Sequence, residues 1–172
     1  MRYRIQGRQH AQALVEFAVV SPFLLLILFG FLDLGLGEAS SLSLNGAVRA
    51  GARFAAVSPL AYDPTNPASA GTIQGAVQES ALLDTIASSE IAIAYFLPEP
   101  SGVVECGTYS TGMDSFVAQP GFTEGNCLVQ GVTVVQVSAA IVYDPITPLF
   151  KTIDPSGITL SASSSLTLEQ TS

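Results

Sequence analysis

The sequence has few of the residues on which most enzymes depend. Its 172 residues include one His and two Cys, and Lys and Arg together number six. His10 precedes a long apolar run, so the rest of the chain cannot build a Ser/His/Asp or Cys/His arrangement. A Gly-rich phosphate loop after a strand and His or Cys residues at metal-ligand spacing are also absent. These absences disfavour an enzyme and predict neither a cofactor nor a metal site.

Two catalytic arrangements stay open in chemical terms. One is a Ser/Lys pair that uses Lys151, and the other is a carboxylate pair such as Asp144 and Asp154. Acids next to turns are ordinarily just solvated. Both catalytic interpretations are therefore weaker than the interpretation that the protein acts through surface contacts.

Positive charges are few, and the charges of both signs are distributed unevenly along the chain. The formal net charge is -8, three arginines precede the apolar run, and only three basic residues accompany eleven acids after Glu38. Positive residues on the short flank predict a cytoplasmic N-terminus and an acidic body outside the membrane. Three scattered cations form no basic stripe for a phosphate backbone, which disfavours nucleic-acid binding.

The apolar run itself covers residues 13–36 and has the length of a membrane span. At about 1.5 Å per residue it makes a helix of about 36 Å, enough to cross a hydrocarbon core of about 30 Å with some tilt. Glu16 lies near the N-terminal end of this run. A carboxylate there is costly, which indicates either a functional group or a side chain that reaches the headgroups, and both interpretations are open.

Cys106 and Cys127 both lie in the part assigned to the oxidising side of the membrane. A disulfide between them is the natural expectation, with two free thiols as the alternative.

The fold class predicted is α+β. The membrane helix is expected to continue outward as a stalk through residues 40–57, and a second helix to start at Thr72, with Ile86 continuing its apolar face. Alternating apolar residues predict strands near Ile91, over 132–143 and over 158–168, while residues 97–131 read as a long loop. The second helix would then pack on a small antiparallel sheet of about three strands.

Residues 11–17, Ala-Gln-Ala-Leu-Val-Glu-Phe, stand between the basic leader and the apolar run. They resemble the processing site of TadE-like pilin-type proteins of bacterial tight-adherence (Flp) pilus systems. In that family a prepilin peptidase cuts after a small residue, usually Gly. The resemblance places the cut between Ala11 and Gln12, which makes Glu16 the fifth residue of the mature chain and Phe17 its neighbour. Ala11 in place of Gly departs from the family pattern.

The resemblance extends to two further segments. Residues 45–56 are similar to the family's arginine-and-alanine helix, and residues 132–143 and 158–168 are similar to its closing strands. The resemblance implies a pilin-like fold with a basic cytoplasmic leader (1–11), a transmembrane helix (12–37) and an extracytoplasmic α+β domain (38–172). It implies a single-pass protein of the bacterial inner membrane.

The function implied is that of a minor pseudopilin or assembly factor of the pilus or a related secretion apparatus. Its partners would be the membrane, the prepilin peptidase, other pilin-like subunits and the assembly platform. If cleavage exposes the amine of Gln12, Glu16 of a neighbouring subunit can pair with it in low dielectric, which compensates two otherwise costly groups.

Two other interpretations of the N-terminus stay open. The leader and apolar run could be a secretory signal cut near Glu38, which would release a soluble secreted α+β domain. The chain could also be a bitopic envelope protein that is never processed. The three interpretations predict mature chains that start at Gln12, near Glu38 or at Met1.

Overall fold

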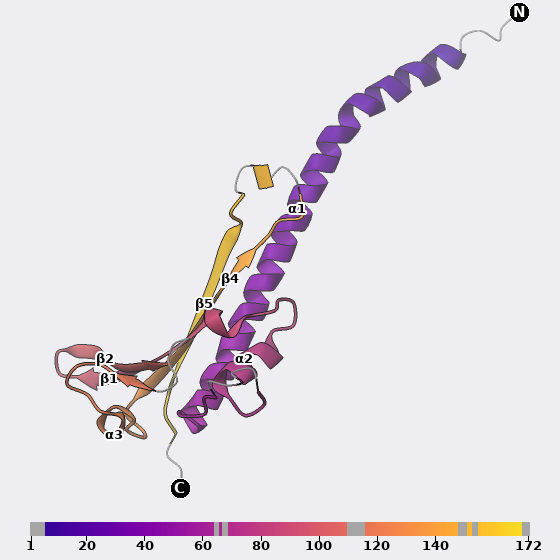
Figure 1. Cartoon of the computed structure of the whole chain (residues 1–172). Helices are drawn as coiled ribbons and strands as arrows, with labels where there is room; N and C mark the ends of the chain where they lie inside the picture. The colour runs from indigo at the N-terminus through magenta and orange to yellow at the C-terminus, as the bar shows by residue number, and fades with distance from the viewer. Residues whose placement is uncertain are drawn as a thin grey trace, which may run out of the picture.

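A computed structural model describes residues 6–63, 66, 69–109, 116–147, 151–152 and 155–169, and only the backbone of residues 6–11. It has an α+β fold in which a long N-terminal helix runs past one side of a small antiparallel sheet (Figure 1).

Helix α1 (Gln6–Val57) is one uninterrupted element of 52 residues, or about 78 Å. Pro22 lies inside it, and α1 curves in its N-terminal part (Figure 1). A proline removes one backbone donor and crowds the preceding turn, so a bend is its expected effect. The predicted continuation of the apolar helix into a stalk ending at Val57 is confirmed.

The sheet has five strands in the order β3-β2-β1-β4-β5, all antiparallel. Their bounds are β1 Ile91–Glu99, β2 Gly102–Tyr109, β3 Val117–Ala118, β4 Val134–Tyr143 and β5 Ile158–Thr167. The predicted alternation is correct for β4, where Val135, Val137 and Ala139 are buried opposite Tyr95, Ile93 and Ile91 of β1. The prediction of about three strands was two short.

The region predicted as a long loop, residues 97–131, is where the sequence prediction was wrong. It holds the end of β1, all of β2 and β3, and a short helix α3 (Glu124–Cys127). Strand β2 buries Cys106 and the adjacent residues irregularly, and its register with β1 shifts between Tyr95 and Phe96. A bulge interrupts the period-two pattern of a strand. Strand β2 is therefore stabilised by its pairing with β1, and the sequence gives no local signal of that pairing.

The core lies where the C-terminal half of α1 packs against β4 and β5, with helix α2 (Ile73–Ser80) packed on α1. Thr72 caps α2, its hydroxyl accepting a hydrogen bond from the Gly75 amide at 2.9 Å. The second helix was correctly predicted to begin here, but it ends at Ser80, so Ile86 joins the core from outside the helix.

Gly51 allows the close approach of α1 and α2. A Cβ on Gly51 would collide with Cγ2 of Val77 and lie 3.3 Å from Cγ1 of Val137. The absence of a side chain at this position therefore sets the spacing of three elements of the core.

Tyr95 links the sheet to the end of α1 and should make stability fall in alkali. It is fully buried, its hydroxyl donates to the carbonyl of Pro59, and burial raises the pKa of Tyr95 above its usual range. The unfolded chain ionises this tyrosine near pH 10, so its contribution is complete below about pH 10 and is lost as the pH rises further.

The free energy of unfolding of the parent should therefore fall more steeply between about pH 10 and 12 than that of Tyr95→Phe, by up to about 1.4 kcal/mol per pH unit. Urea titrations of both proteins in detergent at several pH values measure this difference. Equal slopes for the two proteins would contradict it.

Candidate functional site

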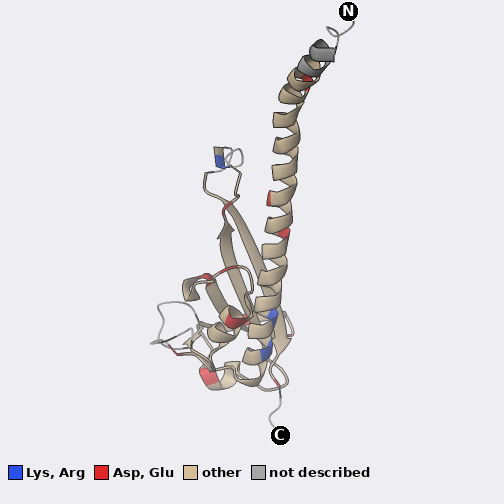
Figure 2. Ribbon diagram, turned by 90° about the vertical axis from the view of Figure 1, so that its right-hand side faces the viewer, with Lys and Arg blue, Asp and Glu red and all other residues tan. Residues whose placement is uncertain are grey.

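The N-terminal half of α1 is an apolar rod without a partner in the chain. From Gln12 to Leu32 its side chains are exposed, apart from partial cover at Ser21 and Gly30, and most are Leu, Val, Ile, Phe or Ala. Figure 2 shows this part of the helix almost free of charged residues. By length and composition α1 is the one helix among the described residues that can cross a membrane. So large an apolar surface needs lipid or protein around it.

The predicted processing and assembly residues lie together at the start of this rod. The Gln12 side chain donates a hydrogen bond to Glu16 Oε1 at 3.1 Å, because residues four apart share one helix face. Glu16 and Phe17 are exposed, and Ala11 belongs to α1, although its side chain is outside the described part. Helix α1 thus runs through the predicted cleavage point, and both the cleavage and the role of Glu16 stay predictions.

Asp33 marks the other end of the rod, and the sequence interpretation passed over it. Its carboxylate accepts hydrogen bonds from the amide of Ile146 at 2.9 Å, from the amide of Thr147 at 3.1 Å and from the Thr147 hydroxyl. Only 5 % of Asp33 is exposed. Three donors from the β4–β5 connection therefore bind this carboxylate to a segment more than a hundred residues away in sequence.

Tyr143, the last residue of β4, strengthens the same contact. Its hydroxyl donates to the backbone carbonyl of Asp33 at 3.2 Å. Its ring packs beside Gly37, with Cε1 3.6 Å from the position that a Cβ on Gly37 would take. Desolvation, followed by the nearby charge of Asp33, raises the pKa of Tyr143, which further disfavours ionisation of the hydroxyl that donates the hydrogen bond to Asp33. We call this set of contacts the Asp33 clasp.

One sequence signal could have revealed the clasp. Asp33 is a second acid in the apolar run. It is followed at intervals of four, three and four residues by Gly37, Ser40 and the core residue Leu44, so all four share one helix face. An acid on a core-facing stripe needs buried donors. The sequence does not show that the β4–β5 connection supplies them.

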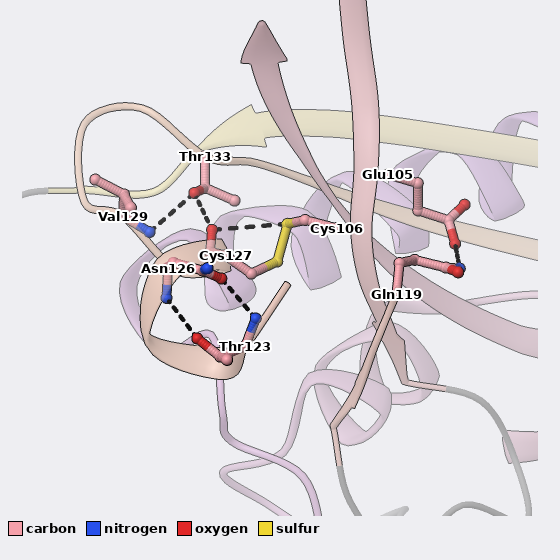
Figure 3. Close-up of a disulfide and its surroundings, with 8 residues drawn as sticks. All are labelled: Glu105, Cys106, Gln119, Thr123, Asn126, Cys127, Val129 and Thr133. Atoms are coloured by element: carbon pink, nitrogen blue, oxygen red, sulfur yellow. Dashed lines mark hydrogen bonds between the residues drawn. A yellow bond between two sulfur atoms is a disulfide. The ribbon is translucent and has the colours of Figure 1, made fainter. Parts of the chain in front are cut away.

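The cysteines form the predicted disulfide between β2 and the end of α3, with the two Cα atoms 5.5 Å apart (Figure 3). Both are fully buried. Thr133 supports this corner, its hydroxyl donating to the Cys127 carbonyl and accepting from the Val129 amide at 2.9 Å. The Thr123 amide donates a hydrogen bond to Asn126 Oδ1 at 2.6 Å, which caps the short helix. The disulfide thus joins an irregular segment to the sheet.

The described residues do not support either catalytic alternative. Lys151 pairs with Asp144 at 2.8 Å, and both side chains are largely in solvent. Asp154 lies outside the described residues. Within the described part, no group of three or more His, Cys, Asp or Glu residues is placed to hold a metal ion.

Comparison with known families gives a match that covers most of α1. Residues 11–53 match the family model described as TadE-like protein. This segment is therefore similar to the TadE-like family. No curated protein and no solved structure matches the chain.

The TadE-like segment covers a quarter of the chain and lies wholly within α1. It contains Gln12, Glu16, Asp33 and Gly51, so it includes the apolar rod, one side of the Asp33 clasp and the first part of the core. The suspected resemblance is confirmed over this segment, whereas the sheet and the disulfide lie beyond it. A TadE-like match and an apolar N-terminal helix together fit a membrane protein associated with Tad pili.

Proposed function

We propose that this protein is a minor pseudopilin or assembly factor of a tight-adherence (Flp) pilus or a related secretion apparatus. Residues 12–37 would anchor it in the bacterial inner membrane, with residues 1–11 in the cytoplasm and 38–172 outside. The observation that carries this proposal is α1. It is one continuous helix whose apolar half is exposed and whose other half forms the core, and its residues 11–53 match the TadE-like family model.

The packing of α1 supports an anchor over a cleaved secretory signal. A cut near Glu38 would divide a continuous helix and remove Asp33, which binds the amides of Ile146 and Thr147. The released domain would lose one side of the clasp. A signal segment has no such structural tie to the domain that it exports.

The leader is proposed to be cut by the prepilin peptidase between Ala11 and Gln12. N-terminal sequencing of the protein purified from bacterial membranes tests this directly. A start at Gln12 is expected. A start near Glu38 would instead identify a secreted domain, and a start at Met1 would identify an unprocessed bitopic protein.

Glu16 is proposed to set the register of neighbouring subunits by pairing with the new amine of Gln12 in the bilayer. Glu16 is exposed, and its only described side-chain hydrogen bond is the one from Gln12, so it is accessible to a neighbour. Losing one partner of an ion pair in low dielectric leaves the other charge uncompensated, which costs several kcal/mol.

We therefore expect Glu16→Ala to reduce the amount of protein that copurifies with sheared pili or the assembly complex by roughly tenfold or more. Glu38→Ala is the matched control, because it removes an exposed acid from the same helix outside the apolar rod. Both variants should remain in the membrane fraction. Incorporation of Glu16→Ala at the parental level would show that the pairing is wrong.

A further inference from the structure

The β4–β5 connection reaches along α1 to the place where the apolar rod ends. Figure 1 shows this connection extending beside α1 in the direction of its N-terminus, away from the rest of the sheet. Its described residues are 144–147, 151–152 and 155–157, and we call the first two of these stretches the hairpin tip. The Asp33 clasp holds this tip against the helix through the backbone amides of Ile146 and Thr147.

The length of the rod places the clasp at a bilayer surface. Residues 12–32 form about 31 Å of helix, which equals the thickness of a typical hydrocarbon core. When these residues span the membrane, Asp33 lies at its extracytoplasmic boundary, and the hairpin tip lies beside it at the same level. An acid at that depth is costly unless its oxygens are hydrogen-bonded, and the tip supplies three donors.

The chemistry of the tip suits the boundary between headgroups and acyl chains. Ile146 is 70 % exposed although its own amide is bound to Asp33, so its side chain points away from the clasp contact. Lys151 and Asp144 form an ion pair that compensates the two charges of the tip. An exposed apolar side chain beside a compensated pair can enter an interface that is part water and part lipid.

We propose that the hairpin tip is a second membrane contact, in which Ile146 inserts at the headgroup–acyl boundary of the extracytoplasmic leaflet next to α1. This inference rests on the proposed insertion of α1. With contacts at both α1 and the tip, the domain would have a fixed face toward the membrane. We commit to lipid as the occupant because the amide of exposed Ile146 is bound to Asp33, the residue directly before exposed Leu34, at the end of an apolar rod of membrane-spanning length.

The chain contains no Trp, so single tryptophans are clean depth probes. Three full-length variants are reconstituted into two sets of vesicles of phosphatidylethanolamine and phosphatidylglycerol, one with lipids brominated near the headgroup end of the acyl chain and one with lipids brominated near its methyl end. Leu24→Trp reports the rod, Ile146→Trp the tip, and Val103→Trp serves as the control. Val103 matches Ile146 closely, because it is 69 % exposed and lies on β2, far from α1.

We expect the bromine near the methyl end to quench Leu24→Trp most strongly, the bromine near the headgroup end to quench Ile146→Trp most strongly, and neither to quench Val103→Trp. Quenching of Leu24→Trp without quenching of Ile146→Trp overturns the second contact while membrane anchoring stands. An unquenched Leu24→Trp means that α1 itself is not inserted, which overturns the proposed anchoring.

The clasp is tested in the same vesicles by adding Asp33→Ala to each Trp variant. Without the carboxylate the tip loses three acceptor contacts, so quenching of Ile146→Trp should drop to the level of the Val103→Trp control. Leu24→Trp should remain quenched, and the circular dichroism spectrum should not change, which shows that the sheet is still folded. Unchanged quenching of Ile146→Trp would show that Asp33 does not position the tip.

Discussion

Replacing both Cys106 and Cys127 by Ser is expected to lower the free energy of unfolding by about 3 kcal/mol. The disulfide closes a loop with a sequence separation of 21, and removing it restores the conformational entropy of that loop in the unfolded chain. Domains of this size are stable by about 5–15 kcal/mol, so the loss is a large fraction of the total. Urea unfolding of the full chain in detergent, followed by circular dichroism, measures it.

The structure also indicates where the loss should be felt first. The bridge holds α3 and β3 against β2, a strand whose pattern is irregular and whose neighbour β3 has two residues. Amide hydrogen exchange should therefore accelerate in residues 116–128 more than in β4. Treating the parent with a reductant under denaturing conditions and refolding it without oxidant provides the control, because it should reproduce the Ser variant. Equal urea midpoints for the parent and the double variant would refute the prediction.

Gly51→Ala is expected to destabilise the protein by about 1–3 kcal/mol, the range of overpacked cores. The added methyl group would collide with Val77 of α2, whose β-branched side chain is stiff in a helix, and would press on Val137 of β4. Since α2 covers α1 through this contact, the variant should also loosen α2, which is visible as faster exchange of the amides of residues 76–80.

Gly46→Ala is the matched control, five residues earlier on the same helix. A Cβ on Gly46 has nothing within 4 Å, so the change adds helix propensity without a collision. It should stabilise the protein by about 0.5–1 kcal/mol. Opposite signs for the two variants are the expected result of the same urea experiment, and a stabilised Gly51→Ala protein would contradict the packing described for α1 and α2.

The parts of the fold predicted correctly are those whose signal is local. Residues 13–57 form a helix because apolar and small residues recur at helical spacing over many turns, and β4 is a strand because Val135, Val137 and Ala139 alternate with polar residues. The pairing of Cys106 with Cys127 followed from their number and their predicted side of the membrane.

The parts that were missed depend on distant partners. Strand β2 is ordered by pairing with β1 across a register shift, and the two-residue β3 exists only because β2 is there. Asp33 was overlooked because its neighbours in the sequence are apolar and offer it no donors. Its donors are the amides of Ile146 and Thr147, more than a hundred residues away. Long-range pairing of this kind leaves no periodic trace in the sequence.

The continuity of α1 makes it a lever between the bilayer and the sheet. About 37 Å of the helix, residues 33–57, extends past the apolar rod and is built into the core. Transmembrane helices tilt by about 20° on average, and a tilt of that size would displace the far end of α1 sideways by roughly 13 Å. A neighbour that changes the tilt of the embedded helix would thereby move the whole domain, without any rearrangement inside it.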